Sequence, residues 1–192
     1  MKMPQEILGY SQIEYLSVFV SFLYAFIVAE FFTGWARMLR NRHSIVVDAG
    51  HLLYSIIFFW ILILNWFALW SQMEFLVRGF HYFVLVCMPI VLAYFAAVLM
   101  FPDFDKEHDL NSYFLKNFKM ISITTSLFIL VNLVIALMLG TASLTSVSTI
   151  VRIINPTLLL VVGLFDLRKW IIPVGAIMAI ALLAGSLMIA MG

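Results

Sequence analysis

The stretch Tyr15–Arg40, YLSVFVSFLYAFIVAEFFTGWARMLR, decides the fold class. Glu30 is the only charged residue in it before Arg37. A run of about 20 apolar residues fits the hydrocarbon core of a bilayer, so this segment predicts a transmembrane helix. A carboxylate at such a depth is expensive unless it has a partner, a proton or water. Glu30 is therefore the first candidate for a functional side chain.

The composition extends this prediction to the whole chain. Hydrophobic residues make up 65% and charged residues 11%, and the mean hydropathy is +1.10. Soluble domains carry roughly 45–50% apolar and about 25% charged residues, and a small fold cannot hide more. We therefore expect a multi-pass protein in a lipid bilayer. The net charge of +1 favours no nucleic-acid partner, and a single cysteine excludes an internal disulfide.

Six apolar segments have the length of a membrane span. They cover residues 13–38, 47–71, 79–101, 118–139, 147–167 and 170–191. We predict one all-α domain over residues 1–192, a bundle of six transmembrane helices. A repeat of three plus three spans with inverted topology would fit this number, but the two halves show no convincing similarity.

Basic residues orient the bundle, because cytoplasmic loops are enriched in them. The loops that follow the first, third and fifth spans hold more of them than the opposite side, which predicts both termini outside the cytoplasm. The first group is Arg37, Arg40, Arg42, Lys106, Lys116, Lys119, Arg168 and Lys169, and the second is Lys2, Arg78 and Arg152.

Small residues form a row along the first span, at every fourth position. The row consists of Ser17, Ser21, Ala25, Ala29 and Thr33. Such a row allows close approach of another helix, so we predict helix packing, self-association or contact with a partner membrane subunit.

Polar residues also align on single faces of three other spans. They are His51, Ser55, Asn65 and Gln72 in the second, Ser122, Thr125 and Asn132 in the fourth, and Arg152, Asn155, Gly163 and Asp166 in the fifth. Lipid offers no hydrogen bonds, so these faces are expected to point inward. Two interpretations stay open: hydrogen bonds that join the helices, or a hydrated pathway.

Depth along the spans sorts the ionisable and polar residues into two groups. The inner cluster is Glu30, Asp48, His51 and Asp166, and the outer cluster is Glu14, His81, Arg152 and Asn155. Matched depth suggests two pairs, Glu30 with His51 and Glu14 with Arg152. Glu30 then has three alternative roles: a structural pair, a site for protons or ions, or a substrate contact.

The acidic loop between the third and fourth spans permits two interpretations. Asp109 can cap a helix that begins near Leu110, or the loop acids together with His108 can bind a divalent cation. We favour the cap. Catalytic, haem and metal motifs are missing from the sequence, so we predict no catalytic residue, no cofactor and no metal site.

Four segments carry a resemblance. The order WARMLRNR (35–42), HLLYSIIFFW (51–60), MPIVLAYFAAVLMFPDFD (88–105) and DLNSYFLKNFK (109–119) resembles a group of uncharacterised small bacterial membrane proteins with several spans. The resemblance implies a location in the bacterial inner (plasma) membrane. It implies no activity.

Three functional hypotheses follow. The first is a transporter or channel for protons, ions or a small polar solute, which would use the inner and outer clusters. The second is a non-catalytic membrane subunit, sensor or scaffold that self-associates or binds a partner. An intramembrane enzyme that acts on lipid is the third, and short loops argue against it.

Overall fold

The computed structural model describes residues 6–7, 10–70, 72, 78–104, 109–144 and 146–191, and the structural statements below concern these residues. Six long helices make up nearly all of this part of the chain, together with one 3-10 turn and a short antiparallel strand pair. The elements are β1 (Glu6–Ile7), β2 (Tyr10–Ser11), α1 (Gln12–Arg40), α2 (Ala49–Trp70), α4 (Phe80–Met100), α5 (Leu110–Met138), α6 (Val147–Leu164), η1 (Arg168–Trp170) and α7 (Ile171–Met191).

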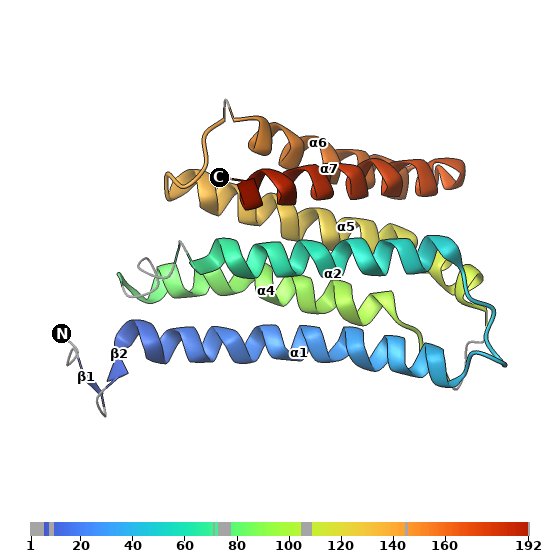
Figure 1. The fold of residues 1–192 in the computed structure, drawn as a ribbon, viewed down its shortest axis with the longest axis horizontal. Helices are drawn as coiled ribbons and strands as arrows, with labels where there is room; N and C mark the ends of the chain where they lie inside the picture. Colours follow the sequence, from blue (N-terminus) through green and yellow to red (C-terminus); the bar gives the residue numbers. More distant parts are fainter. Residues whose placement is uncertain are drawn as a thin grey trace.

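The helices lie roughly side by side along one axis, and successive helices run in opposite directions (Figure 1). α1 lies along one side of the bundle and α6 and α7 along the other, with α2, α4 and α5 between them. α7 returns to α2, where the Tyr54 hydroxyl donates a hydrogen bond of 2.8 Å to the carbonyl of Ile171. The start of α1 and the end of α7 therefore lie at the same end of the bundle.

The structure confirms an all-helical protein suited to a membrane. Among the described residues, five helices are long and apolar enough to cross a bilayer: α1, α2, α4, α5 and the segment Arg168–Ser186 that contains most of α7. α6 is shorter, with an apolar part over Ser148–Leu164. A sixth crossing, and the orientation of the bundle, remain predictions.

The predicted helix cap at Asp109 is confirmed. The Asp109 carboxylate accepts hydrogen bonds from the backbone N–H groups of Asn111 and Ser112, at 3.0 and 3.3 Å. α5 therefore begins at Leu110, ahead of the predicted span 118–139, and continues without a break to Met138. Of the other loop acids, Asp103 is described, whereas those at positions 105 and 107, and His108, lie outside the described residues.

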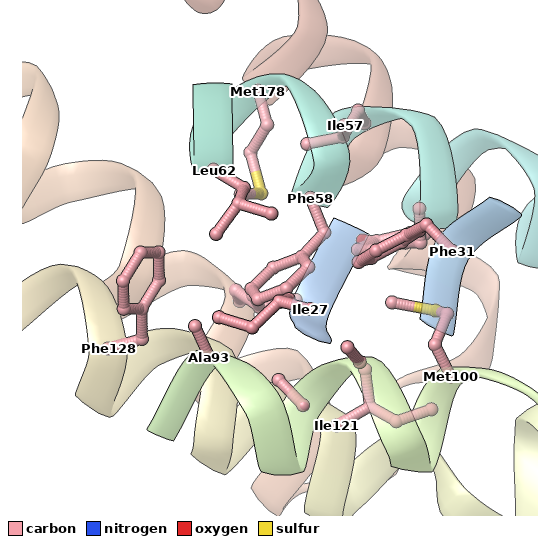
Figure 2. Packing of buried hydrophobic residues seen from close by; sticks show 14 of the residues in the cluster. Ile27, Phe31, Ile57, Phe58, Leu62, Ala93, Met100, Ile121, Phe128 and Met178 are labelled. Carbon is pink, nitrogen blue, oxygen red and sulfur yellow. The ribbon is translucent and has the colours of Figure 1, made fainter. Parts of the chain in front are cut away.

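The core is a layer of large apolar side chains between α1, α2, α4 and α5, and Met178 extends it to α7 (Figure 2). Phe31 and Phe58 are buried at its centre, with ring centroids 5.7 Å apart. In a bilayer such contacts hold helices together mainly by close packing, because lipid tails are as apolar as leucine.

Three glycines mark the closest helix contacts. A Cβ atom on Gly34 would lie 2.3 Å from the Phe101 ring, and one on Gly163 would lie 2.5 Å from Ser122 Cβ. A Cβ on Gly175 would lie 3.0 Å from Leu53 and from Tyr54. The Phe101 ring is a side chain that can shift, whereas Ser122 Cβ is fixed to its helix backbone, so glycine is required most clearly at Gly163, where α6 contacts α5.

Candidate functional site

A polar cavity of about 130 Å³ lies between α2, α5, α6 and α7. It lies toward the end of α2 and the start of α6, in the half of the bundle where α1 begins. Its polar lining residues are Asn65, Asn132, Arg152 and Asn155, and the apolar ones include Ile61, Leu64, Phe128, Leu133, Met178 and Leu182. We call this space the polar cavity.

Two of the three asparagines are held by hydrogen bonds to the protein. The Tyr24 hydroxyl of α1 donates to Asn65 Oδ1, and the Asn65 NH₂ group makes no hydrogen bond within the described residues. Asn132 Nδ2 donates at 2.8 Å to the carbonyl of Phe128 in its own helix, which leaves Oδ1 as the unbonded acceptor. The first asparagine therefore presents a donor and the second an acceptor.

Asn155 has no such anchor. It is 9% exposed and lines the cavity, and its side chain makes no hydrogen bond within the described chain. Its amide atoms are not among the fully buried polar atoms that lack a partner in the described chain, so a molecule in the cavity can reach them. Its neighbour Pro156 has no N–H and leaves the carbonyl of Arg152 without its usual helical partner. The carbonyl of Pro156 accepts a hydrogen bond of 2.9 Å from Ser126, which ties α6 to α5.

Arg152 gives the cavity its charge. It lies five residues after the start of α6, about 8 Å along the axis, and is exposed. Within the described ranges no carboxylate lines the cavity or pairs with Arg152. The site therefore combines one guanidinium with three amides and a largely apolar wall.

The inner cluster is only partly assembled. The backbone N–H of His51 donates at 2.6 Å to Asp48 Oδ2, a contact that caps the first turn of α2. The buried imidazole uses Nε2 to bind the carbonyl of Met100, at 2.7 Å, so it ties α2 to the end of α4. Among the described residues His51 Nδ1 has no hydrogen-bond partner. Glu30 is half-buried, and no hydrogen bond or ion pair joins it to His51 within the described part of the chain.

The remaining predicted residues lie apart from the polar cavity. Asp166 is exposed in the turn after α6, where it forms an ion pair of 3.1 Å with Arg168. Glu14 is exposed in the first turn of α1, and His81 is exposed at the start of α4 beside Tyr82. The outer cluster thus separates, and only Arg152 and Asn155 share a site.

Aromatic side chains fill the bundle toward the other end. Phe31 lies 5.5 Å from Phe101, and the His51 ring lies 5.7 Å from both Phe101 and Phe114, measured between ring centroids. Phe114 in turn lies 5.2 Å from Phe118. We call Phe31, Phe101, Phe114 and Phe118 the aromatic layer. Its rings come from α1, α5 and the end of α4, and they pack together toward the end of the bundle where α1 ends.

Sequence reasoning omitted Asn65 and Asn132 from the candidate site. The sequence could have indicated both residues, because they lie on the polar faces of their spans at intermediate depth. The contribution of Met178 and Leu182 from α7 had no polar signal at all. It depends on the return of α7 to α2.

The small-residue row of α1 is mostly uncovered. Ser17 and Ser21 donate to carbonyls of their own helix, at 2.8 and 2.7 Å. Ala25, Ala29 and Thr33 are exposed. α1 instead buries the neighbouring residues Val20, Tyr24, Ile27 and Phe31. That the row packs against a helix of another subunit therefore stays a prediction.

The described residues contain no group of three or more histidines, cysteines or acids arranged to hold a metal. Comparison with protein-family models, curated proteins and solved structures gives no match for this chain. The function must therefore be argued from the polar cavity itself.

Proposed function

We propose that this protein is a membrane transporter that binds a small polar solute in the polar cavity. The single observation that carries the proposal is Asn155, a nine-tenths buried amide that faces the cavity with no partner in the described chain. As part of the same proposal we place the protein in the bacterial inner membrane.

The main alternative for the polar residues is structural hydrogen bonding, and other residues here serve that purpose. Trp35 Nε1 donates to Ser55 at 3.2 Å, and Tyr54 and Ser126 each reach a carbonyl of another helix. These groups have partners, as structural contacts require. Asn155 and Arg152 make no hydrogen bond or ion pair within the described chain, and both line the cavity. A solute or water would satisfy them.

The position of the cavity also suits transport. Arg152 is exposed near the start of α6, so solute from that side has a short route to Asn155. The aromatic layer lies toward the opposite end of the bundle and does not line the cavity. Alternating access requires a second state in which helices separate at that layer, and hinged or rocking bundles provide such states.

The test is solute uptake by proteoliposomes that contain the wild type, Asn155→Leu or Asn117→Leu. Asn117 is the matched control, because its amide already donates at 3.0 Å to the Tyr113 carbonyl of its own helix and does not line the cavity. We expect uptake of a panel of small polar solutes to be lost only in Asn155→Leu, with both variants folded. Equal uptake by the two variants would contradict the proposal.

Two further variants separate the other candidate functions. Glu30→Gln tests whether Glu30 takes part in transport of protons or ions. If this variant loses proton or ion flux while Asn155→Leu keeps it, the site lies in the inner cluster instead. The uncovered residues Ala25, Ala29 and Thr33 favour the subunit alternative. Ala29→Leu is expected to change the oligomeric state in that case and to leave uptake unchanged under the present proposal.

A further inference from the structure

The chemistry of the polar cavity narrows the class of solute, and this step rests on the transport function proposed above. Among the described lining residues Arg152 carries the one formal charge, and the acids are absent. A cation would meet an uncompensated guanidinium there. An anion would supply the opposite charge that pairs with the guanidinium. A carboxylate would also accept its hydrogen bonds, as in other arginine–carboxylate contacts.

The free hydrogen-bonding groups agree with an anion. Tyr24 occupies Asn65 Oδ1, so Asn65 offers its NH₂ group as a donor. Asn155 can turn its own NH₂ group to the same space, because nothing in the described chain holds its amide. With Arg152 these residues form a set of donors from α2 and α6. Asn132 differs from these two residues. Its NH₂ group already donates to the Phe128 carbonyl, so it presents only the acceptor Oδ1.

Size and the apolar wall restrict the anion further. The cavity measures about 130 Å³. An engineered apolar cavity of about 150 Å³ binds benzene, so a solute of about six non-hydrogen atoms fits here. Ile61, Leu64, Met178 and Leu182 surround the remaining space and would contact an alkyl group. A divalent anion such as phosphate or a dicarboxylate would bring a second negative charge against this wall without a second cation, which is costly.

We propose that the polar cavity binds a short-chain monocarboxylate of two to about four carbons. The carboxylate contacts Arg152, Asn155 and the Asn65 amide, and the alkyl end packs between Leu64 and Met178. No covalent step is involved. Acetate, propionate and butyrate are the probes that match this description.

The first experiment is equilibrium binding of labelled propionate to the full-length protein in nanodiscs. A mildly alkaline buffer keeps the acid ionised, so that little neutral acid enters the lipid. The wild type should bind propionate, and Arg152→Gln should weaken binding by about tenfold or more, because the charge-assisted hydrogen bonds are lost. Arg168→Gln is the matched control: Arg168 is paired with Asp166 in the turn after α6 and does not line the cavity. It should bind as the wild type does.

Competition decides the class of solute. Acetate and butyrate should displace propionate, whereas propionamide, phosphate and a long-chain fatty acid should not. Displacement by propionamide as strong as by acetate would overturn the anion inference and leave the polar-solute function in place. Binding unaffected by Arg152→Gln and Asn155→Leu would place the anion elsewhere and overturn the site. If no member of the solute panel is bound or taken up, both the inference and the proposed function fail.

Discussion

Alanine at position 163 should separate α5 from α6, two of the four helices that line the polar cavity. The added Cβ would lie 2.5 Å from Ser122 Cβ and 2.6 Å from Ser122 Oγ. Carbon atoms pack best at about 3.5–4.0 Å, so α6 would have to move from α5 by about 1 Å at this point. The obstruction is the Cβ of a neighbouring helix, which cannot rotate away. The strain must therefore be taken up by the helices themselves.

The size of the effect follows from two opposing contributions. Overpacking a well-packed contact costs about 1–3 kcal/mol. Alanine is favoured over glycine inside a helix by roughly 0.5–1 kcal/mol, which opposes that loss. We expect Gly163→Ala to lower the free energy of unfolding by about 1 kcal/mol. Gly185→Ala is the control, because a Cβ there meets no atom within 4 Å, and it should be neutral or slightly stabilising.

The assay is reversible unfolding in mixed micelles with increasing SDS, followed by the helical circular dichroism signal. Ser122→Gly removes the obstructing Cβ, so its combination with Gly163→Ala should be more stable than the sum of the two single changes predicts. Two results would refute the close contact between α5 and α6. One is that Gly163→Ala is as stable as Gly185→Ala, and the other is that the effects of Gly163→Ala and Ser122→Gly simply add in the double mutant.

Three further predictions use the same unfolding measurement. Phe31→Ala should lower the free energy of unfolding by about 3–5 kcal/mol, because Phe31 is fully buried, and a loss below about 1 kcal/mol would contradict its central place in the core. His51→Leu should cost about 1–3 kcal/mol by leaving the Met100 carbonyl unbonded, and wild-type stability in this variant would argue against that bond. Hydrogen bonds from the Ser112 side chain and backbone lower the pKa of Asp109, so its stabilising effect should be complete above the ordinary carboxyl pKa and fade as the pH falls through the lowered value. Melting temperature against pH checks this: Asp109→Asn keeps the cap but should flatten that acid-side fall, and an unchanged fall in the variant would assign it to other groups.

The helical architecture was predictable because it depends on local physics. Apolar length predicts a span wherever about 20 residues must satisfy their backbone hydrogen bonds without water. The cap at Asp109 is equally local, since it joins a side chain to N–H groups two and three residues away. Three residues of the predicted polar faces, Asn65, Asn132 and Asn155, line one cavity, whereas Asp166 from the same predicted face of the fifth span is exposed in a turn.

The arrangement of helices around the axis was not predictable in the same way. Depth fixes one coordinate, and two residues at one depth can lie on opposite sides of the bundle. Glu14 belongs to α1 and Arg152 to α6, and these two helices lie on opposite sides of the bundle (Figure 1). His51 shows a second limit, because its ring binds the backbone carbonyl of Met100, a partner that no residue pattern reveals. The contact between Gly163 and Ser122 likewise joins two helices through positions with no shared motif.

The polar residues within this bundle therefore do not share one role. Buried hydroxyl and indole groups, such as those of Tyr54, Ser126 and Trp35, are paired with other helices and act as structural contacts. His51 Nδ1 and Thr125 Oγ1 lack partners, but neither residue lines the polar cavity, so they offer no site to a solute. Asn155 and Arg152 combine two properties: no group of either side chain has a partner in the described chain and both line a space, whereas Asn65 and Asn132 each have one amide group paired. Because only that combination predicts a ligand, the two residues are where loss of binding should be separable from loss of folding.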